Sequence, residues 1–239
     1  MNQLISVVIP VYNHANSIKK SLLSLSKQTY RPLEVILVDD ASTDNLDEAL
    51  KKVNGSEWGK SLNIAIFKQS ENRGAAAARN CGLKQAKGSF VIFWDADTIA
   101  KPNMLDRMHG TLQHHPKAAY AYSQFRFGWK KIASAAFDAD RLKKQNFIDT
   151  TSLIRREETC PFDENLKRFQ DWDLWLTLLE KNRTGIFIPE VLYKKQVAGR
   201  KGYSSWVPSF MFKLPFKTAQ VKAYEKRREI VLVKHRLKS

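Results

Sequence analysis

Two aspartates, Asp95 and Asp97, follow a continuous apolar run and have the type and spacing to hold a metal ion. The run, residues 89–94, is typical of a buried strand. Side chains alternate along an extended backbone, so both carboxylates can point the same way from its C-terminal end, where open α/β sheets bind ligands. Two oxygen ligands without a full cage suit Mg²⁺ or Mn²⁺, which also bind substrate phosphates. A pair of solvated turn aspartates is the alternative interpretation.

A second acidic pair, Asp39 and Asp40, follows another apolar segment, residues 33–38. In a parallel sheet both acidic clusters lie at the same edge. Asp40 can then accept a hydrogen bond from a nucleobase N–H, while the other cluster holds a metal on phosphates. The alternative is a capped turn before a helix, which would use Asp39, Asp40 and Asp44 for structure alone.

The segment Asn72-Arg73-Gly74 opens a predicted helix, and helix N-termini present free N–H groups that suit phosphate. Arg73 or Arg79 can add positive charge there, and the sequence does not decide between them. There is no Walker A motif and no G-x-G-x-x-G, which disfavours the classical NTPase and dinucleotide-binding classes.

The elements that must position these residues alternate between strand and helix through the first half of the chain. Strands are predicted at residues 4–11, 33–38, 62–67 and 89–94, and helices at 16–28, 45–53 and 74–86. This alternation predicts βαβ units and a mostly parallel sheet with helices on both faces. The second half is less regular, with helices predicted at 103–115 and 171–181 and strands at 118–125 and 186–193.

Length and composition limit the class of protein. The chain has 239 residues, 43% of them hydrophobic, which is enough for one large α/β domain or a domain with an appendage. Cys81 and Cys160 form neither a disulfide framework nor a zinc pattern, as expected in a reducing cytosol. No apolar stretch approaches the roughly 18–20 residues that span a bilayer. We therefore expect a cytoplasmic protein.

The net charge of +16 favours polyanionic partners: nucleic acid, an anionic membrane surface or phosphorylated substrates. Residues 206–239 carry nine Lys or Arg against two Glu, mixed with aromatic residues such as Trp206 and Phe210. This composition suits peripheral association with the cytoplasmic face of a membrane. The alternative is an amphipathic helix that packs on the catalytic domain with its basic face in solvent.

Six motifs together resemble the family 2 glycosyltransferases, which have the GT-A fold. They occur in the family's order and spacing over residues 4–195: Ser6-Val-Val-Ile-Pro-Val-Tyr-Asn13, Ser24-Leu-Ser-Lys-Gln-Thr-Tyr30, Glu34-Val-Ile-Leu-Val-Asp-Asp-Ala-Ser-Thr-Asp44, Asn72-Arg-Gly-Ala-Ala-Ala-Ala-Arg-Asn80, Trp94-Asp-Ala-Asp97 and Phe169-Gln-Asp-Trp-Asp-Leu-Trp175. Each motif is weak alone, but their combination is specific. The resemblance implies inverting transfer of a sugar from a nucleotide donor, of the kind that builds bacterial cell-surface glycans and lipopolysaccharide.

The resemblance also implies roles for individual residues. The family pattern puts Asp40 on the nucleobase, Asp97 on the metal and Asp95 near the donor ribose or sugar, with Asp95 as a second metal ligand. Pro10 and Tyr12 would line the nucleotide pocket, and Arg73 or Arg79 would face the base or the phosphates. Asp171 falls where the family has its catalytic base. An N-cap is the structural alternative for Asp171, and Asp173 is expected to be structural or to contact the acceptor.

The sequence departs from the family pattern in two places. The base motif often begins with Glu, but Gln170 stands here. After the final strand, Tyr193-Lys-Lys-Gln lacks the His that family members often place near the metal, so Lys194, Lys195 or Arg200 is expected on the diphosphate instead. The Gln-x-x-Arg-Trp signature of processive synthases is absent, which favours transfer of a single sugar.

We therefore predict a GT-A domain over residues 1–205, with a nucleotide-binding half at 1–100 and an acceptor-binding half at 101–205, followed by a basic amphipathic extension at 206–239. The predicted reaction moves one sugar, most simply from a UDP-sugar, to a hydroxyl of a glycan or lipid-linked acceptor. The alternatives are a non-enzymatic nucleic-acid-binding protein, which leaves both aspartate clusters unexplained, and a nucleotidyltransferase, which would prefer a Gly-rich N-terminal loop.

Overall fold

The structure is a computed structural model that describes residues 2–132, 134–196 and 217–237. Its first half is a regular alternation of strands and helices. In chain order these are β1 (Ile5–Val11), α1 (Ala15–Ser26), β2 (Leu33–Asp39), α2 (Leu46–Asn54), α3 (Glu57–Lys60), β3 (Ile64–Lys68), α4 (Ala75–Gln85) and β4 (Phe90–Phe93).

The second half contains shorter and less regular elements. They are β5 (Thr98–Ala100), α5 (Met104–His114), β6 (Tyr120–Phe127), β7 (Lys130–Ile132), α6 (Ala139–Lys144), β8 (Leu153–Arg155), η1 (Arg156–Glu158), α7 (Gln170–Glu180), β9 (Gly185–Lys195) and α8 (Ala219–Lys234).

One sheet connects the strands in the order β3-β2-β1-β4-β8-β6-β9-β5, with β7 paired to β6. The strands β3, β2, β1 and β4 are parallel, as predicted. Beyond β4 the sheet is mixed, because β8 is antiparallel to both β4 and β6, and β5 is antiparallel to β9. The sheet is therefore wholly parallel from β3 to β4 and mixed beyond it, where β6 and β9 form a further parallel pair.

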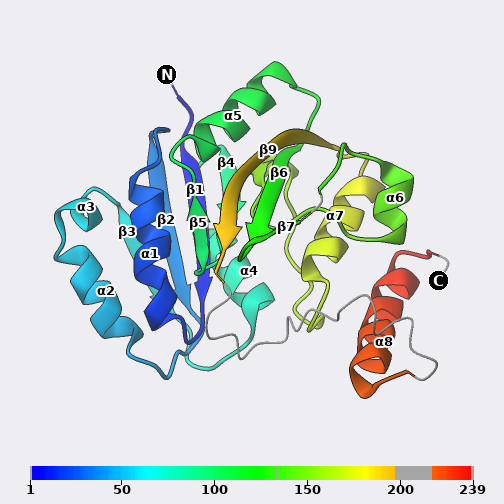
Figure 1. The fold of residues 1–239 in the computed structure, drawn as a ribbon, viewed down its shortest axis with the longest axis horizontal. Helices are drawn as coiled ribbons and strands as arrows, with labels where there is room; N and C mark the ends of the chain where they lie inside the picture. The colour runs from blue at the N-terminus through cyan, green and yellow to red at the C-terminus, as the bar shows by residue number, and fades with distance from the viewer. Residues whose placement is uncertain (1, 133, 197–216, 238–239) are drawn as a thin grey trace.

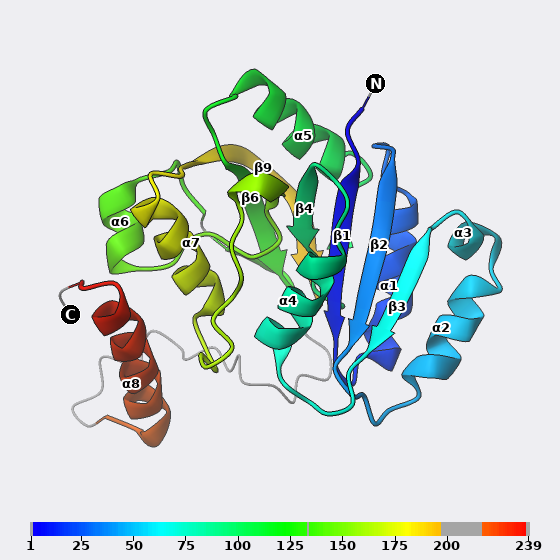
Figure 2. The ribbon, with the colours of Figure 1, turned by 180° about the vertical axis from the view of Figure 1, so that it is seen from behind.

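Helices cover both faces of the sheet. Figure 1 shows α1 in front of the sheet and Figure 2 shows α4 on the opposite face. Apolar side chains alternate along the strands, so that Val7 and Ile9 join the core under α1, while Val8 joins the core under α4. A side chain at Gly82 would meet Val8 Cγ1 at 2.4 Å, so this glycine permits the close packing of the alanine-rich helix α4 on β1.

The C-terminal helix α8 packs beside α7 at one end of the molecule (Figure 1). Its Val231 and Leu232 are buried, so it is part of the fold rather than a solvated tail. The aromatic segment of the predicted extension, residues 206–216, lies outside the described residues. Within the described residues, no helix has the length and apolar character needed to cross a bilayer.

Candidate active site

The loop after β4 carries the two aspartates with which the sequence analysis began. Trp94 is buried, and its indole N–H donates to Ser21 Oγ at 2.9 Å, which ties the start of the loop to α1. Farther along, Gln196 N–H donates to Asp97 O at 3.1 Å. The loop is thus fixed at both ends, with Asp95 and Asp97 held at the C-terminal edge of the central strand.

Asp95 lies between two cations. Arg79 donates to its Oδ1 at 3.1 Å, and Lys195 Nζ lies 2.7 Å from its Oδ2. Burial alone would raise the pKa of Asp95, but the adjacent Lys195 and Arg79 outweigh it and hold the pKa below the ordinary value. Asp95 is therefore ionised and charge-compensated within the fold.

Lys195 also pairs with Asp149, whose Oδ2 lies 2.6 Å from Nζ. The Lys195 side chain is only 8% exposed. Burial would lower its pKa, but Asp149 and Asp95 raise it above the ordinary value, so the ammonium is retained. Asp149 is held further by Tyr193 Oη and by the backbone N–H of Thr151, at 3.0 and 2.9 Å.

Asp171 lies in the first turn of α7, directly after Gln170. The helix begins at Gln170 and Phe169 occupies the cap position, so Asp171 is not an N-cap residue as the structural alternative expected. Asn146 Nδ2 donates to Asp171 Oδ2 at 2.6 Å. Burial raises the pKa of Asp171, and the negative charge of Asp149 adds to this shift.

Arg79 joins the loop after β4 to the N-terminus of α7. Its guanidinium contacts Asp95 through one terminal nitrogen and Gln170 Oε1 through the other, each at 3.1 Å. Because Gln170 precedes Asp171, this bridge brings the two predicted halves of the site together. Gln170, which stands where the family pattern often has Glu, is a neutral hydrogen-bond acceptor for Arg79.

Arg73 lies beside Asp40, and its side chain points to the surface. Its side chain pairs with Glu164 at 2.9 Å and is 57% exposed, whereas the Arg79 side chain is 10% exposed. The sequence left the choice between these two arginines open, and the structure brings only Arg79 to Asp95.

Asp40 is buried and accepts two backbone hydrogen bonds at the start of α4. Arg73 N donates to its Oδ1 and Gly74 N to its Oδ2, both at 2.8 Å. Burial raises the pKa of Asp40 despite these donors. Gly74 has φ of 90°, a conformation that favours glycine. Asp40 thus shapes the turn that starts α4.

Pro10 and Tyr12 lie at the end of β1, beside the end of β2. Val11 pairs with Asp39 across the two strands, and Tyr12 is 43% exposed. The next residue, Asn13, accepts from the backbone N–H of Thr43 at 2.8 Å, which links the loops after β1 and β2. The structure thereby groups Pro10, Tyr12 and Asp40 at one edge.

The side chains around Asp97 partly fit a divalent cation. Asp97 is 5% exposed at the strand edge, and Mg²⁺ or Mn²⁺ needs only one or two carboxylates when substrate phosphates complete its shell. Asp95 could bind the cation only if it released its ion pair with Arg79 or with Lys195. Over the described parts of the chain, no group of three His, Cys, Asp or Glu side chains is placed to hold a metal. Asp97 therefore suits a divalent cation only where ligands from outside the chain, such as phosphate oxygens, complete the shell.

Sequence reasoning predicted the C-terminal helix but missed its contacts with α7 and the contributions of Asp149 and Asn146. Asp149 lies in a loop with no motif, so no signal pointed to it. Asp173 pairs with Lys234 at 2.7 Å and with His235 at 2.9 Å, which makes it structural, one of the two roles expected. The contacts between α8 and α7, the helix that carries Asp171, can be recognised only in the three-dimensional structure.

The comparison with protein families identifies residues 6–159 as matching the model described as Glycosyl transferase family 2. An uncharacterized glycosyltransferase of Haemophilus influenzae is 30% identical over 97% of this chain and 91% of its own length. The Escherichia coli protein WfaP, named as a UDP-Glc:alpha-D-GlcNAc-diphosphoundecaprenol beta-1,3-glucosyltransferase, is 28% identical over 75% of this chain and 71% of its own. The glycosyltransferase GlyG of Streptococcus pneumoniae is 36% identical, over 47% of this chain and 36% of GlyG.

Solved structures share the fold. The 1–349 fragment of Staphylococcus aureus TarS in complex with UDP-GlcNAc has a TM-score of 0.74 at 21% identity, over 96% of this chain and 66% of that one. The mannosyltransferase PcManGT of Pyrobaculum calidifontis, in complex with GDP-Man and Mn²⁺, has a TM-score of 0.67 at 21% identity, over 98% of this chain and 63% of that one. The chain thus spans about two thirds of the length of these solved chains.

Proposed function

The chain belongs to glycosyl transferase family 2, and from this premise we propose that it transfers one sugar from a UDP-sugar to a hydroxyl of a lipid-linked saccharide with inversion at the anomeric carbon. The observation that carries the proposal is the Arg79 bridge, which connects Asp95 to Gln170, the neighbour of the proposed base Asp171. The alternatives of a nucleic-acid-binding protein and a nucleotidyltransferase give way to family membership.

In the proposed reaction Asp171 removes the proton from the attacking hydroxyl, which is a poor nucleophile without a base. Its raised pKa makes it a better proton acceptor than an ordinary aspartate. Asp149 is the competing carboxylate, but Lys195, Tyr193 and Thr151 all donate to it. A carboxylate with three donors is a weaker base, which supports Asp171 in this role.

Around the donor, Asp40, Pro10 and Tyr12 bind the nucleoside, and Arg79 keeps Asp95 oriented toward the ribose and sugar. Asp97 would hold a divalent cation, with Asp95 as a further ligand on exchange of one of its cationic partners. Such a metal, when bound, neutralises charge that develops on the leaving diphosphate. The Mn²⁺ in the PcManGT complex supports this part of the proposal.

The substrates are proposed from the chemistry that the relatives' names state. WfaP is named for UDP-Glc and a diphosphoundecaprenol acceptor, and TarS was solved with UDP-GlcNAc. We accordingly propose a place in the synthesis of a cell-surface polysaccharide, with a UDP-sugar donor and a lipid-diphosphate saccharide acceptor.

The test is a transfer reaction followed by analysis of the product. The protein is incubated with UDP-glucose or UDP-N-acetylglucosamine and N-acetylglucosamine-diphosphate-lipid, with UDP release and product mass recorded. A β-linked product from an α-linked donor supports the proposal. An α-linked product refutes inversion. Absence of UDP release from either donor, with lipid or with water as acceptor, refutes the proposed donor class.

A further inference from the structure

Three cationic side chains stand side by side on neighbouring strands of the sheet. Arg126 of β6 is in register with Lys131 of β7 on one side and with Lys194 of β9 on the other. All three residues are exposed. We call this set, Lys194, Arg126 and Lys131, the cationic row. Like charges directly opposite one another on neighbouring strands destabilise a sheet, so the row is unfavourable for folding alone.

The cationic row has no acidic partner among the residues that the structure describes. Several other surface lysines are paired with a carboxylate, such as Lys68, which lies 2.6 Å from Asp47. Alternation along β9 separates Lys194 from its neighbour Lys195, which turns into the buried acidic cluster. The positive charge of the row is therefore presented outward, and an anion from outside the chain would relieve the repulsion.

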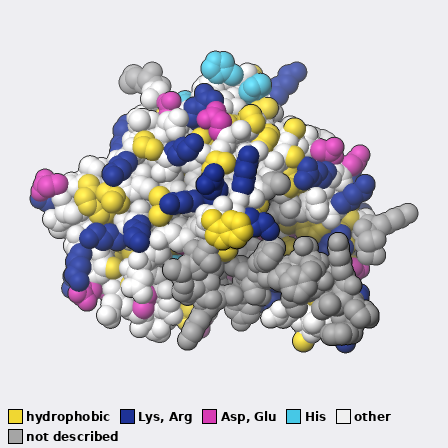
Figure 3. Space-filling view, in the orientation of Figure 1, with side chains coloured by type: hydrophobic (Ala, Val, Ile, Leu, Met, Phe, Trp, Pro, Cys, Tyr) yellow, Lys and Arg dark blue, Asp and Glu magenta, His cyan; other side chains and the backbone are white. Residues whose placement is uncertain are grey.

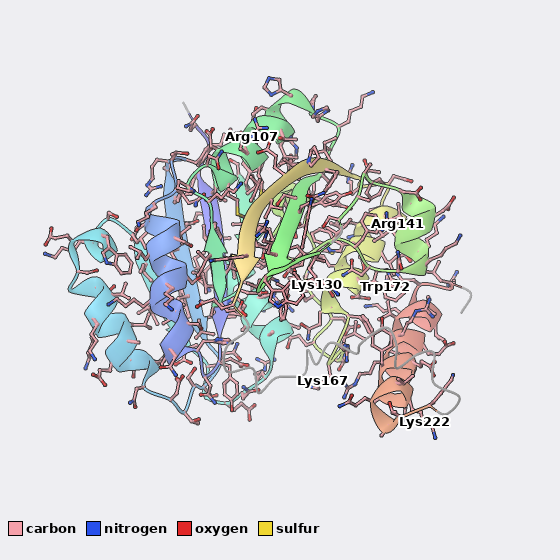
Figure 4. All side chains as sticks on the ribbon, in the orientation of Figure 1. Arg107, Lys130, Arg141, Lys167, Trp172 and Lys222 are labelled. Atoms are coloured by element: carbon pink, nitrogen blue, oxygen red, sulfur yellow. The ribbon has the colours of Figure 1, made fainter. Side chains whose placement is uncertain are left out.

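An exposed tryptophan completes this surface. Trp129 lies in the turn between β6 and β7 and is 90% exposed. Lys130 follows it at the start of β7, and Figure 4 places Lys130 near the middle of the face. Figure 3 shows Lys and Arg side chains gathered over the middle of the same face around a hydrophobic patch. Tryptophan beside Lys and Arg is the composition that favours the headgroup region of a bilayer.

We propose that the cationic row and Trp129 form a docking surface for the anionic phospholipid headgroups of a membrane. Charge complementarity argues for this partner, because a row of three cations fits a planar array of phosphates, and the indole can enter the interface between headgroups and acyl chains. The surface lies beside the candidate active site, since Gly128 N–H donates to Lys195 O at 3.0 Å. Docking here holds the site at the bilayer, where a lipid-linked acceptor resides. Lipid binding itself needs neither donor nor sugar transfer, so it stands apart from the proposed function.

The test measures binding to vesicles without any donor. Vesicles of phosphatidylglycerol and phosphatidylcholine are compared with phosphatidylcholine alone by co-sedimentation. The row variant Arg126→Gln/Lys131→Gln is expected to lose about 25-fold in partitioning to the anionic vesicles, about fivefold for each cation removed. Two variants with the same charge change serve as controls: Lys51→Gln/Lys84→Gln on the helices of the first half, and Lys222→Gln/Lys226→Gln on α8. The controls are expected to change partitioning much less than the row variant.

Trp129 gives a second readout. A blue shift of tryptophan emission on anionic vesicles that disappears in Trp129→Phe is expected. The proposal is overturned if the row variant binds like wild type, if the α8 variant loses as much as the row variant, or if both vesicle types bind equally. Retained UDP release by a row variant that no longer binds vesicles would separate this surface from the chemistry of the site.

Discussion

Lys195 Nζ lies 2.7 Å from Asp95 Oδ2, so a buried ammonium holds a carboxylate at the end of the central strand. The same ammonium holds Asp149 at 2.6 Å. The loops that carry Asp95 and Asp149, 54 residues apart in sequence, are thereby fixed to the end of β9. The Lys195 ammonium also contributes positive charge to the surroundings of any metal or diphosphate bound at this edge.

Removal of this ammonium should destabilise the fold. Lys195→Met leaves Asp95 and Asp149 without their shared cation in a largely buried place, and we expect the free energy of unfolding to fall by about 3 kcal/mol. Urea denaturation followed by circular dichroism measures the change. The adjacent Lys194→Met is a matched control, because Lys194 is exposed, and should stay within about 0.5 kcal/mol of wild type. Equal stability of the two variants would show that the buried ion pairs are not structural.

Loss of the carboxylate at Asp171 should remove the base. Asp171→Asn is expected to lower kcat by roughly 10²- to 10⁴-fold with little effect on UDP affinity, because the residue acts on the acceptor. In the wild-type enzyme Asp171 must be ionised to act as a base. Because its pKa is raised, the acidic limb of the kcat–pH profile should lie above the ordinary Asp pKa of about 3.9. Asp140→Asn, on the exposed side of α6, is the control and should keep full activity. Full activity of Asp171→Asn would point to Asp149 instead.

Arg73, just before α4, and Arg79, within it, should differ in importance. Arg79→Gln removes the bridge between Asp95 and Gln170, and we expect kcat/KM for the donor to fall about 10- to 100-fold, since hydrogen bonds to charged groups contribute about 1.5–3 kcal/mol. Arg73→Gln removes a surface pair with Glu164, so less than a threefold effect is expected. Steady-state UDP release compares them. A larger effect at Arg73 would contradict the arrangement described for the site.

The junction of α8 with α7 should weaken as pH rises. His235 lies 2.9 Å from Asp173 and 2.8 Å from Glu180, and Lys234 lies 2.7 Å from the same Asp173 oxygen. An imidazole that donates from both nitrogens is positively charged. Burial lowers the pKa of His235, but hydrogen bonds to Asp173 and Glu180 raise it above the ordinary value.

Because the folded-state pKa of His235 is raised, its stabilising contribution is fully present below the unfolded pKa of about 6.5 and is lost as pH rises through the folded value. We therefore expect His235→Gln to cost about 2 kcal/mol at pH 5.5 and less at pH 9. Thermal unfolding across this range measures the difference. The exposed His115→Gln should show no such trend. A cost that is constant with pH would mean that His235 stays neutral.

The sequence predicted the elements that carry a long, consistent pattern. The strands 4–11 and 33–38 and the helices at 16–28 and 74–86 each match an observed element within two residues at either end. The short elements α3, β5, β7, α6 and β8 were missed, because three to six residues are too few to show a period. These short elements depend on the neighbouring strands and helices for their structure, because their own sequences are too short to specify it.

For the site, the order of the motifs predicted which strand ends meet, and the structure groups Asp40, Pro10 and Tyr12 at one edge and Asp95 with Arg79 at the same sheet edge. The sequence could not predict that Lys195 turns inward while Lys194 faces solvent, since both fit the same basic segment. It also could not reveal Asp149, because a single Asp in a loop has no distinguishing neighbours. These contacts depend on the mixed half of the sheet, whose register the sequence does not encode locally.

The measurement that tests the central claim most directly is calorimetric titration of UDP into the protein with and without Mn²⁺, for wild type and for Asp97→Ala. We predict that wild type binds UDP and that Mn²⁺ strengthens the binding. In Asp97→Ala the affinity for UDP with Mn²⁺ should fall at least roughly tenfold, since one direct charged ligand contributes more than about 1.4 kcal/mol. The control Asp140→Ala should keep the wild-type affinity. Absence of UDP binding to wild type, or equal Mn²⁺-dependent binding to Asp97→Ala, would contradict a nucleotide-diphosphate site at this edge of the sheet.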